Sequence, residues 1–270
     1  MDSMMLLTAY LALGCFAGVV AGLLGVGGGL IMVPILAVLF GLHGFAAEHI
    51  MQLAVGTSLA VIVFTSVSSA LAHHRRGAVR WPLVLQLSMG FAVGGWLGGV
   101  LAVWLGGVLL ALVFGLFELV VAAQMMLGKA PPVGRSEPGV VSNAVAGIFI
   151  GAVSALLGIG GGTLTVPWLT WHNLDIRAAV GTSAACGLPI ALVGSAGFMV
   201  AGWGQAGLPA ASSGYVYWPA VAGISIASVS SAPLGARLAH YLDQRKLKRV
   251  FAGFLACLGV LMIVRNLFAW

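Results

Sequence analysis

The feature of this sequence that most limits its fold is a series of long apolar stretches separated by short loops. Eight of these stretches have 19 to 26 residues, and they occupy residues 4–24, 50–72, 81–105, 108–127, 139–157, 178–202, 215–240 and 250–270. About 20 mostly apolar residues are enough for a helix to cross the roughly 30 Å of hydrocarbon in a bilayer. A helix also satisfies its own backbone hydrogen bonds there. The sequence therefore predicts an all-α polytopic membrane protein.

Charged residues are too few for a protein surrounded by water. The 270 residues include 12 Lys and Arg and 6 Asp and Glu, which is 7%, whereas soluble proteins carry about 25%. The net charge of +6 is explained by the Lys and Arg that membrane proteins place on their cytoplasmic side. We therefore expect a multi-pass protein of the cell (inner) membrane, with the lipid bilayer as a partner and no nucleic acid.

An internal duplication fills the chain. Residues 21–36 read AGLLGVGGGLIMVPIL, and residues 154–169 read SALLGIGGGTLTVPWL, at an offset of 133 residues. The sequence AVGTS then follows in both copies, at 54–58 and at 179–183. A repeat of this length predicts two similar units. They are a first transmembrane repeat over 1–127, a cytoplasmic linker over 128–138, and a second, inverted transmembrane repeat over 139–270.

The inversion is inferred from the basic loops. The second apolar stretch of each unit, 30–42 or 163–171, is short, but if all five stretches cross, the two units have opposite orientations. The basic loop HHRRGAVR follows the third stretch of the first unit, whereas DQRKLKR follows the fourth stretch of the second. Ten crossings place both loops on the cytoplasmic side and both termini outside it. The alternative is eight spans with two re-entrant segments.

Two glycine-rich breaks precede the short stretches. The glycines are Gly25, Gly27, Gly28 and Gly29 in the first unit and Gly158, Gly160, Gly161 and Gly162 in the second. Such a break exposes backbone N–H groups, and the helix that follows presents its positive end to the same place. Interrupted segments at matching positions of two repeats indicate a substrate site, here for an anion. The alternative is that these glycines only allow a tight turn and close helix packing.

Each AVGTS sequence places two hydroxyl groups inside an apolar stretch. They belong to Thr57 and Ser58 in the first unit and to Thr182 and Ser183 in the second. A hydroxyl can donate a hydrogen bond to an oxyanion, so we predict that these four residues line the substrate path. The alternative is that each hydroxyl bonds to the backbone of its own helix or makes a small packing contact.

Glu118 is a candidate for proton coupling. It lies near the centre of an apolar stretch, in GLFELVVA, where a carboxylate is unfavourable and is a functional hypothesis by default. The second unit has no acid at the corresponding place. Glu118 is therefore either a residue that carries a coupling proton or a neutral or paired structural carboxyl.

The other chemistry-bearing side chains are scattered. No His, Cys, Asp and Glu residues show the spacing of a metal site, and no Ser, His and Asp arrangement suits hydrolysis. We therefore predict no metal, no cofactor and no catalytic residues, and a protein that is not an enzyme.

Taken together, these motifs resemble the sulfite exporter TauE/SafE family of membrane transporters. The resemblance rests on the paired GLLGVGGGLIMVP and ALLGIGGGTLTVP sequences, the paired AVGTS sequences, HHRRGAVRW, and APLGARLAHYLDQRKLKRVFAGFL. It implies a transporter of small sulfur-containing or organic anions, such as sulfite or an organosulfonate. From the inverted repeats we expect a secondary transporter that works by alternating access. A coupling proton or cation is a candidate partner. The alternative function is a non-transporting membrane subunit that anchors or assembles a larger complex. The direction of transport and the oligomeric state are left open.

Overall fold

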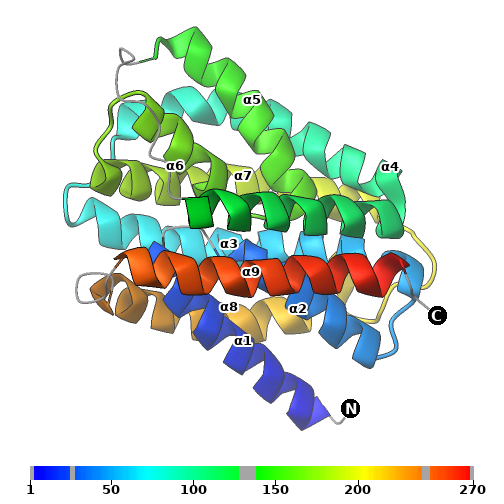
Figure 1. Ribbon diagram of the computed structural model, residues 1–270. Coiled ribbons are helices and arrows are strands. Elements are labelled where there is room, and N and C mark those ends of the chain that lie inside the picture. The colour runs from blue at the N-terminus through cyan, green and yellow to red at the C-terminus, as the bar shows by residue number, and fades with distance from the viewer. Residues whose placement is uncertain (1–2, 25–27, 128–137, 239–243, 268–270) are drawn as a thin grey trace.

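The computed structural model describes residues 3–24, 28–127, 138–238 and 244–267, which form a bundle of helices with one small ribbon (Figure 1). Within these ranges six helices are long and apolar enough to cross a membrane. The predicted all-α polytopic membrane fold is thus confirmed. The elements are α1 (Ser3–Leu24), α2 (Gly29–Leu42), the 3-10 helix η1 (Ala47–His49), α3 (Ile50–His74), α4 (Trp81–Leu127), α5 (Val140–Leu157), α6 (Gly162–Trp171), α7 (Ile176–Ala201), β1 (Ser212–Ser213), β2 (Val216–Tyr217), α8 (Trp218–Leu238) and α9 (Gln244–Leu267).

Helix α4 consists of two consecutive helical segments. Its 47 residues would measure about 70 Å if the helix were straight, more than twice the hydrocarbon thickness. The backbone leaves the helical conformation at Gly106, where φ is 71° and ψ is 166°. A positive φ suits glycine because it has no Cβ atom. The break divides α4 into residues 81–105 and 107–127, close to the boundary between two apolar stretches of the sequence.

Helices α2 and α6 are too short to cross a bilayer alone. They have 14 and 10 residues, or about 21 and 15 Å at the usual rise per residue. Their first residues, Gly29 and Gly162, are buried, and the two positions are related by the 133-residue offset of the duplication. Both short helices therefore begin inside the bundle, directly after a glycine-rich break.

The two sequence units interlock. Helix α1 packs along α8, and residues 81–105 of α4 pack along α5. Helix α3 packs against α7, and residues 107–127 of α4 pack against α9. Each of these four pairs joins a helix from the first half of the chain to one from the second half, so neither half forms a separate body.

Equivalent glycines make equivalent contacts in two of these pairs. A Cβ atom on Gly14 of α1 would overlap the carbonyl oxygen of Ile224 in α8, and one on Gly147 of α5 would overlap that of Leu87 in α4. Gly14 and Gly147 are 133 residues apart, and Leu87 and Ile224 are 137 apart. Small residues let helix backbones approach closely in membranes, and here they do so at matching places of the α1–α8 and α4–α5 pairs.

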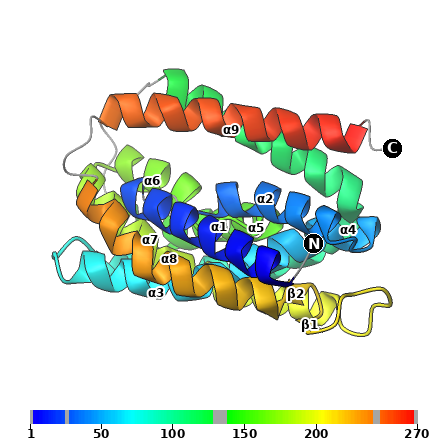
Figure 2. The same cartoon turned by 90° about the horizontal axis from the view of Figure 1, so that it is seen from below.

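One end of the bundle carries exposed arginines. Figures 1 and 2 both show the end of α3, the end of α8 and the start of α9 at one end of the bundle, and the start of α1 and the end of α9 toward the other. Arg75, Arg76 and Arg80 follow α3, and Arg249 lies in the first turns of α9; all four are exposed. We call this the basic end and the opposite end the far end.

A two-stranded ribbon, which the sequence analysis does not predict, lies in the uncharged loop before α8. Strands β1 and β2 pair antiparallel, with Ser212 opposite Tyr217 and Ser213 opposite Val216. The ring of Tyr217 packs against Phe40 and Phe45, with ring centres 5.7 and 5.2 Å away. The ribbon and the end of α2 thereby form an aromatic cluster at the far end.

Candidate functional site

The glycine-rich breaks of the two units contact each other. A Cβ atom on Gly29 would overlap the carbonyl oxygen of Gly158 and lie 2.7 Å from the Cα atom of Ile159. Gly158 ends α5 in the left-handed conformation, with φ 66°, which favours glycine. Gly25 and Gly27, the other predicted residues of the first break, lie outside the described residues.

The two breaks differ in backbone conformation. Gly28 precedes α2 with φ 72°, whereas its counterpart Gly161 precedes α6 with φ −51°. Neither residue is accompanied by a side-chain cap on its helix. By contrast, the Asp175 carboxylate caps α7 by accepting hydrogen bonds from two backbone N–H groups, both at 3.0 Å. The first N–H groups of an uncapped helix are available to a ligand.

The threonines of the AVGTS sequences hold the other unit in place. Thr57 accepts a hydrogen bond from the backbone N–H of Tyr217, and Thr182 accepts one from the backbone N–H of Arg80, both at 3.0 Å. Tyr217 and Arg80 each stand directly before a Trp-Pro pair that begins a helix. These Trp-Pro pairs are visible in the sequence at 81–82 and 218–219 but were not among the predicted features.

The serines of the AVGTS sequences are in different states. Ser58 donates a hydrogen bond to the carbonyl oxygen of Gly158 at 2.8 Å. Ser183 is 1% exposed, and its hydroxyl has no hydrogen-bond partner among the described residues. Leaving a buried hydroxyl unpaired is unfavourable by about 1–3 kcal/mol, so such a group in a native protein calls for an explanation.

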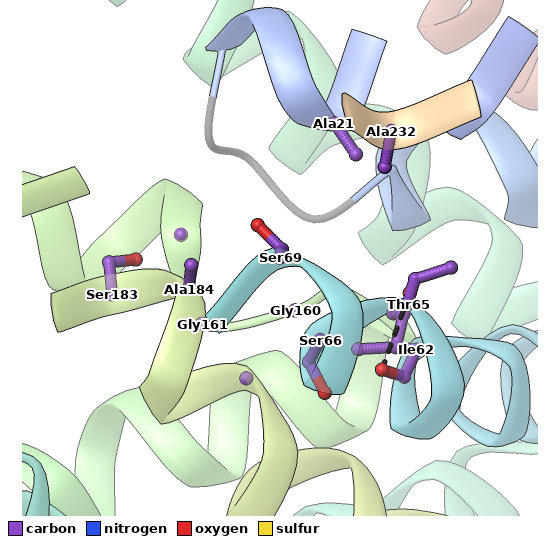
Figure 3. A pocket seen from close by; sticks show the side chains of 12 residues that line it. Ala21, Ile62, Thr65, Ser66, Ser69, Gly160, Gly161, Ser183, Ala184 and Ala232 are labelled. Atoms are coloured by element: carbon purple, nitrogen blue, oxygen red, sulfur yellow. Dashed lines mark hydrogen bonds between the residues drawn. The ribbon is translucent and has the colours of Figure 1, made fainter. Parts of the chain in front are cut away.

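The Ser183 side chain faces a small cavity between helices of both units (Figure 3). The cavity has a volume of about 30 Å³, more than the 10–15 Å³ or so that a water molecule needs. Its lining residues are Ala21, Ile62, Thr65, Ser66, Ser69, Gly160, Gly161, Gly162, Ser183, Ala184, Gly187 and Ala232. The structure therefore brings Gly160, Gly161, Gly162 and Ser183 of the predicted site together.

Helix α3 contributes hydroxyl groups that the sequence analysis did not select. Thr65 and Ser66 donate hydrogen bonds to carbonyl groups of their own helix. Figure 3 shows the Ser69 hydroxyl pointing into the open space in the middle of the view and the Ser66 hydroxyl pointing away from it. The run TSVSS at 65–69 is a visible polar signal inside an apolar stretch.

The start of α6 brings the positive end of a helix dipole to the cavity. Gly161 and Gly162 form this helix end and line the cavity, and a helix N-terminus carries roughly half a positive elementary charge. The buried Thr165 hydroxyl has no partner among the described residues, and it lies 3.1 Å from where a Cβ atom on Gly161 would be. Backbone N–H groups and free hydroxyls at one place suit a bound oxyanion.

The cavity lies in the half of the bundle toward the basic end. It is lined by the later turns of α1, α3 and α8, and α3 and α8 finish at the basic end. At the far end, burial and the nearby Glu48 carboxylate raise the pKa of Tyr215. The four exposed arginines of the basic end therefore lie on the cavity side. The far end holds the aromatic cluster and Arg265 of α9, whose guanidinium a Cβ atom on Gly41 would overlap.

Glu118 lies apart from this cavity. It is fully buried in the second part of α4, and neither carboxyl oxygen has a hydrogen-bond partner among the described residues. Its Cβ atom is 3.2 Å from where a Cβ atom on Gly259 of α9 would be. The carboxyl thus belongs to the interface between α4 and α9.

Among the residues that the structure describes, no three His, Cys, Asp or Glu side chains gather into a group that could hold a metal ion.

The profile of a known family, described as sulfite exporter TauE/SafE, matches residues 10–262. The chain belongs to the sulfite exporter TauE/SafE family. It is 36% identical to a "Probable membrane transporter protein" of Haemophilus influenzae, over 94% of this chain and 97% of that protein. It is 27% identical to "Probable membrane transporter protein YunE" of Bacillus subtilis, over 95% and 97%. No solved structure matches it. This TauE/SafE protein is therefore a multi-pass member of a membrane transporter family.

Proposed function

We propose that this TauE/SafE protein carries small anions across the membrane and binds them in the cavity between the start of α6 and Ser183. One observation carries the proposal: a buried hydroxyl without a partner among the described residues and an uncapped helix N-terminus face the same cavity. Both are groups that stabilise an oxyanion through hydrogen bonds. The name of the family, sulfite exporter, points to sulfite or an organosulfonate as the cargo.

The proposed transport cycle is alternating access between two inverted repeats, 1–127 and 139–270. It is supported by the matching hydrogen bonds of Thr57 and Thr182 and by the matching close contacts of Gly14 and Gly147. Further support is the different conformation of Gly28 and Gly161, because two inverted repeats take different conformations whenever access is open on one side. The interlocked helices imply that the moving bodies combine helices from both repeats, rather than one repeat rocking against the other.

The test compares two serine-to-alanine substitutions in α7. Ser183→Ala removes the unpaired hydroxyl at the cavity, whereas Ser195→Ala removes a buried hydroxyl that donates to the Leu192 carbonyl oxygen at 3.2 Å, outside the cavity lining. Anion uptake is measured in liposomes that contain the purified protein, and thermal unfolding is measured in detergent. We expect Ser183→Ala to raise the KM for the anion about tenfold, a loss of about 1.4 kcal/mol, and Ser195→Ala to leave it unchanged.

Stability separates a binding role from a structural one. Removing a buried hydroxyl that has no partner leaves no other group unsatisfied, so Ser183→Ala should unfold at the wild-type temperature or above it. Wild-type KM in Ser183→Ala would contradict the proposed site. Absence of uptake by the folded wild-type protein would favour the alternative of a membrane subunit that does not transport.

A further inference from the structure

We propose that the cavity selects singly charged oxyanions over doubly charged ones, an inference that rests on the proposed anion transport. The twelve described residues that line the cavity are Ala, Ile, Thr, Ser or Gly, so this part of the lining carries no formal charge. What it offers an anion is the positive end of α6 and the Ser183 hydroxyl, which has no partner within the described ranges. These groups are dipoles, and together they attract an anion less strongly than the full positive charge of a Lys or Arg side chain would.

The selectivity follows from how the desolvation penalty and the attraction to the site depend on the charge of the ion. The free energy needed to take an ion out of water rises with the square of its charge, whereas the attraction to a fixed dipole rises only in proportion to the charge. A second charge therefore doubles the attraction and multiplies the desolvation penalty by about four. A neutral, buried site accepts the first charge much more readily than the second.

The arginines of the basic end do not change this balance. Arg75, Arg76 and Arg80 are exposed and absent from the cavity lining. Charges that lie in water are screened, and they raise the local concentration of anions of either valence rather than pair with an ion inside the cavity. The basic end thus attracts anions, and the cavity determines which of them bind.

The chemical class that fits is an oxyanion with one charge and a small apolar substituent. The oxygens of a sulfonate can accept from Ser183 and from the first N–H groups of α6. The remaining lining includes Ala21, Ile62 and Ala232, which suit a methyl group. Methanesulfonate has one charge at every pH near neutrality, sulfate has two, and sulfite changes from one to two over that range.

The experiment measures competition in liposomes that contain the purified protein, with the membrane potential held at zero. Uptake of radiolabelled methanesulfonate is inhibited with unlabelled methanesulfonate or with sulfate, at pH 6 and pH 8. We expect sulfate to inhibit at least about tenfold more weakly. We also expect sulfite to inhibit better at pH 6 than at pH 8, while methanesulfonate inhibits equally at both.

A substitution that adds charge tests the physical cause. Ala184 lines the cavity and is partly exposed, so a longer side chain can be placed there. Ala184→Lys should bring the inhibition constant of sulfate close to that of methanesulfonate, and Ala184→Gln, of similar size but neutral, should keep the wild-type ratio. An unchanged ratio in a folded Ala184→Lys protein contradicts the electrostatic cause.

The outcomes separate this inference from the proposed function. If wild-type protein takes up methanesulfonate and sulfate inhibits equally well, anion transport holds and the selectivity is wrong. If neither anion is taken up and neither inhibits sulfite uptake, the cavity is not the proposed site for sulfonates and the selectivity is wrong as well. If no anion of any kind is taken up, the proposed function itself fails.

Discussion

Thr57 and Thr182 stand at the same place in two identical pentapeptides, and their side chains make the same hydrogen bond to the other half of the chain. Ser58 and Ser183 stand next to them, yet Ser58 is bonded to Gly158 and Ser183 is unpaired among the described residues. Identical local sequence therefore does not give identical roles. The threonines serve as anchors in this structure, and Ser183 is the hydroxyl that we propose donates to the anion.

Replacing Thr182 with Val should destabilise the protein. Thr182→Val keeps the shape of the side chain but leaves the backbone N–H of Arg80 without its acceptor, and we expect a loss of about 1–3 kcal/mol. Thr170→Val is the matched control, because the Thr170 hydroxyl donates to carbonyl groups of its own helix. Thermal unfolding in detergent measures both. Equal unfolding temperatures for the two variants would show that the anchor contributes nothing.

A pH series distinguishes a Glu118 that carries a coupling proton from a Glu118 that is only a structural carboxyl. Glu118→Gln keeps the size of the buried side chain but cannot take up or release a proton. If Glu118 carries a coupling proton, the pH dependence of uptake should flatten in Glu118→Gln and persist in Glu48→Gln, a control at an exposed carboxylate. A wild-type pH profile in Glu118→Gln removes the proton role and leaves a structural carboxyl.

At the scale of elements, the apolar stretches predicted the helices well because length and composition decide which segments can lie in a bilayer. The start of α2 and of α6 after the glycine-rich breaks followed from the same reasoning. The β1–β2 ribbon and the Ser69 hydroxyl were missed. The ribbon is a short hairpin within a loop that was expected only to be uncharged. The TSVSS run is visible in the sequence, but the place of Ser69 at the cavity depends on which helices become neighbours.

Close helix packing predicts which glycines tolerate a methyl group. A Cβ atom on Gly90 of α4 would overlap the backbone of α5 at Ala144, whereas one on Gly253 of α9 has open space around it. Gly90→Ala should therefore destabilise the protein by about 1–3 kcal/mol. Gly253→Ala should be neutral or slightly stabilising, because alanine favours helix. Chemical unfolding of both variants measures the difference, and an equally stable Gly90→Ala would show that α4 and α5 are not held this closely.

At the scale of the whole molecule, the chain is a bundle in which helices of the first half of the sequence pack against helices of the second half. Gly14 meets Ile224 in the α1–α8 pair as Gly147 meets Leu87 in the α4–α5 pair, which a simple list of apolar stretches does not reveal. The cavity, the four exposed arginines of the basic end and the end of α3 lie toward one end, and the aromatic cluster lies at the other, where Arg265 reaches Gly41 of α2.

The orientation of the bundle in the membrane is testable with reporters. Arginines favour the cytoplasmic side, so the basic end should lie in the cytoplasm and both termini outside it. A reporter fused after Trp270 should behave as external, and one inserted after Gly77, in the turn that follows α3, should behave as cytoplasmic. A cytoplasmic reporter at Trp270 would rule out the five-plus-five arrangement.

Anion transport is tested by uptake into liposomes that contain wild-type protein and no other protein, with sulfite, thiosulfate, methanesulfonate and a carboxylate as labelled substrates. Transport through the cavity predicts saturable uptake of at least one sulfur oxyanion above the rate of empty liposomes. It also predicts that a folded Gly161→Val protein, whose added side chain would crowd Ile190 and Thr165 beside the cavity, loses that uptake. No uptake of any of these anions by the wild-type protein, or wild-type uptake by Gly161→Val, would contradict it.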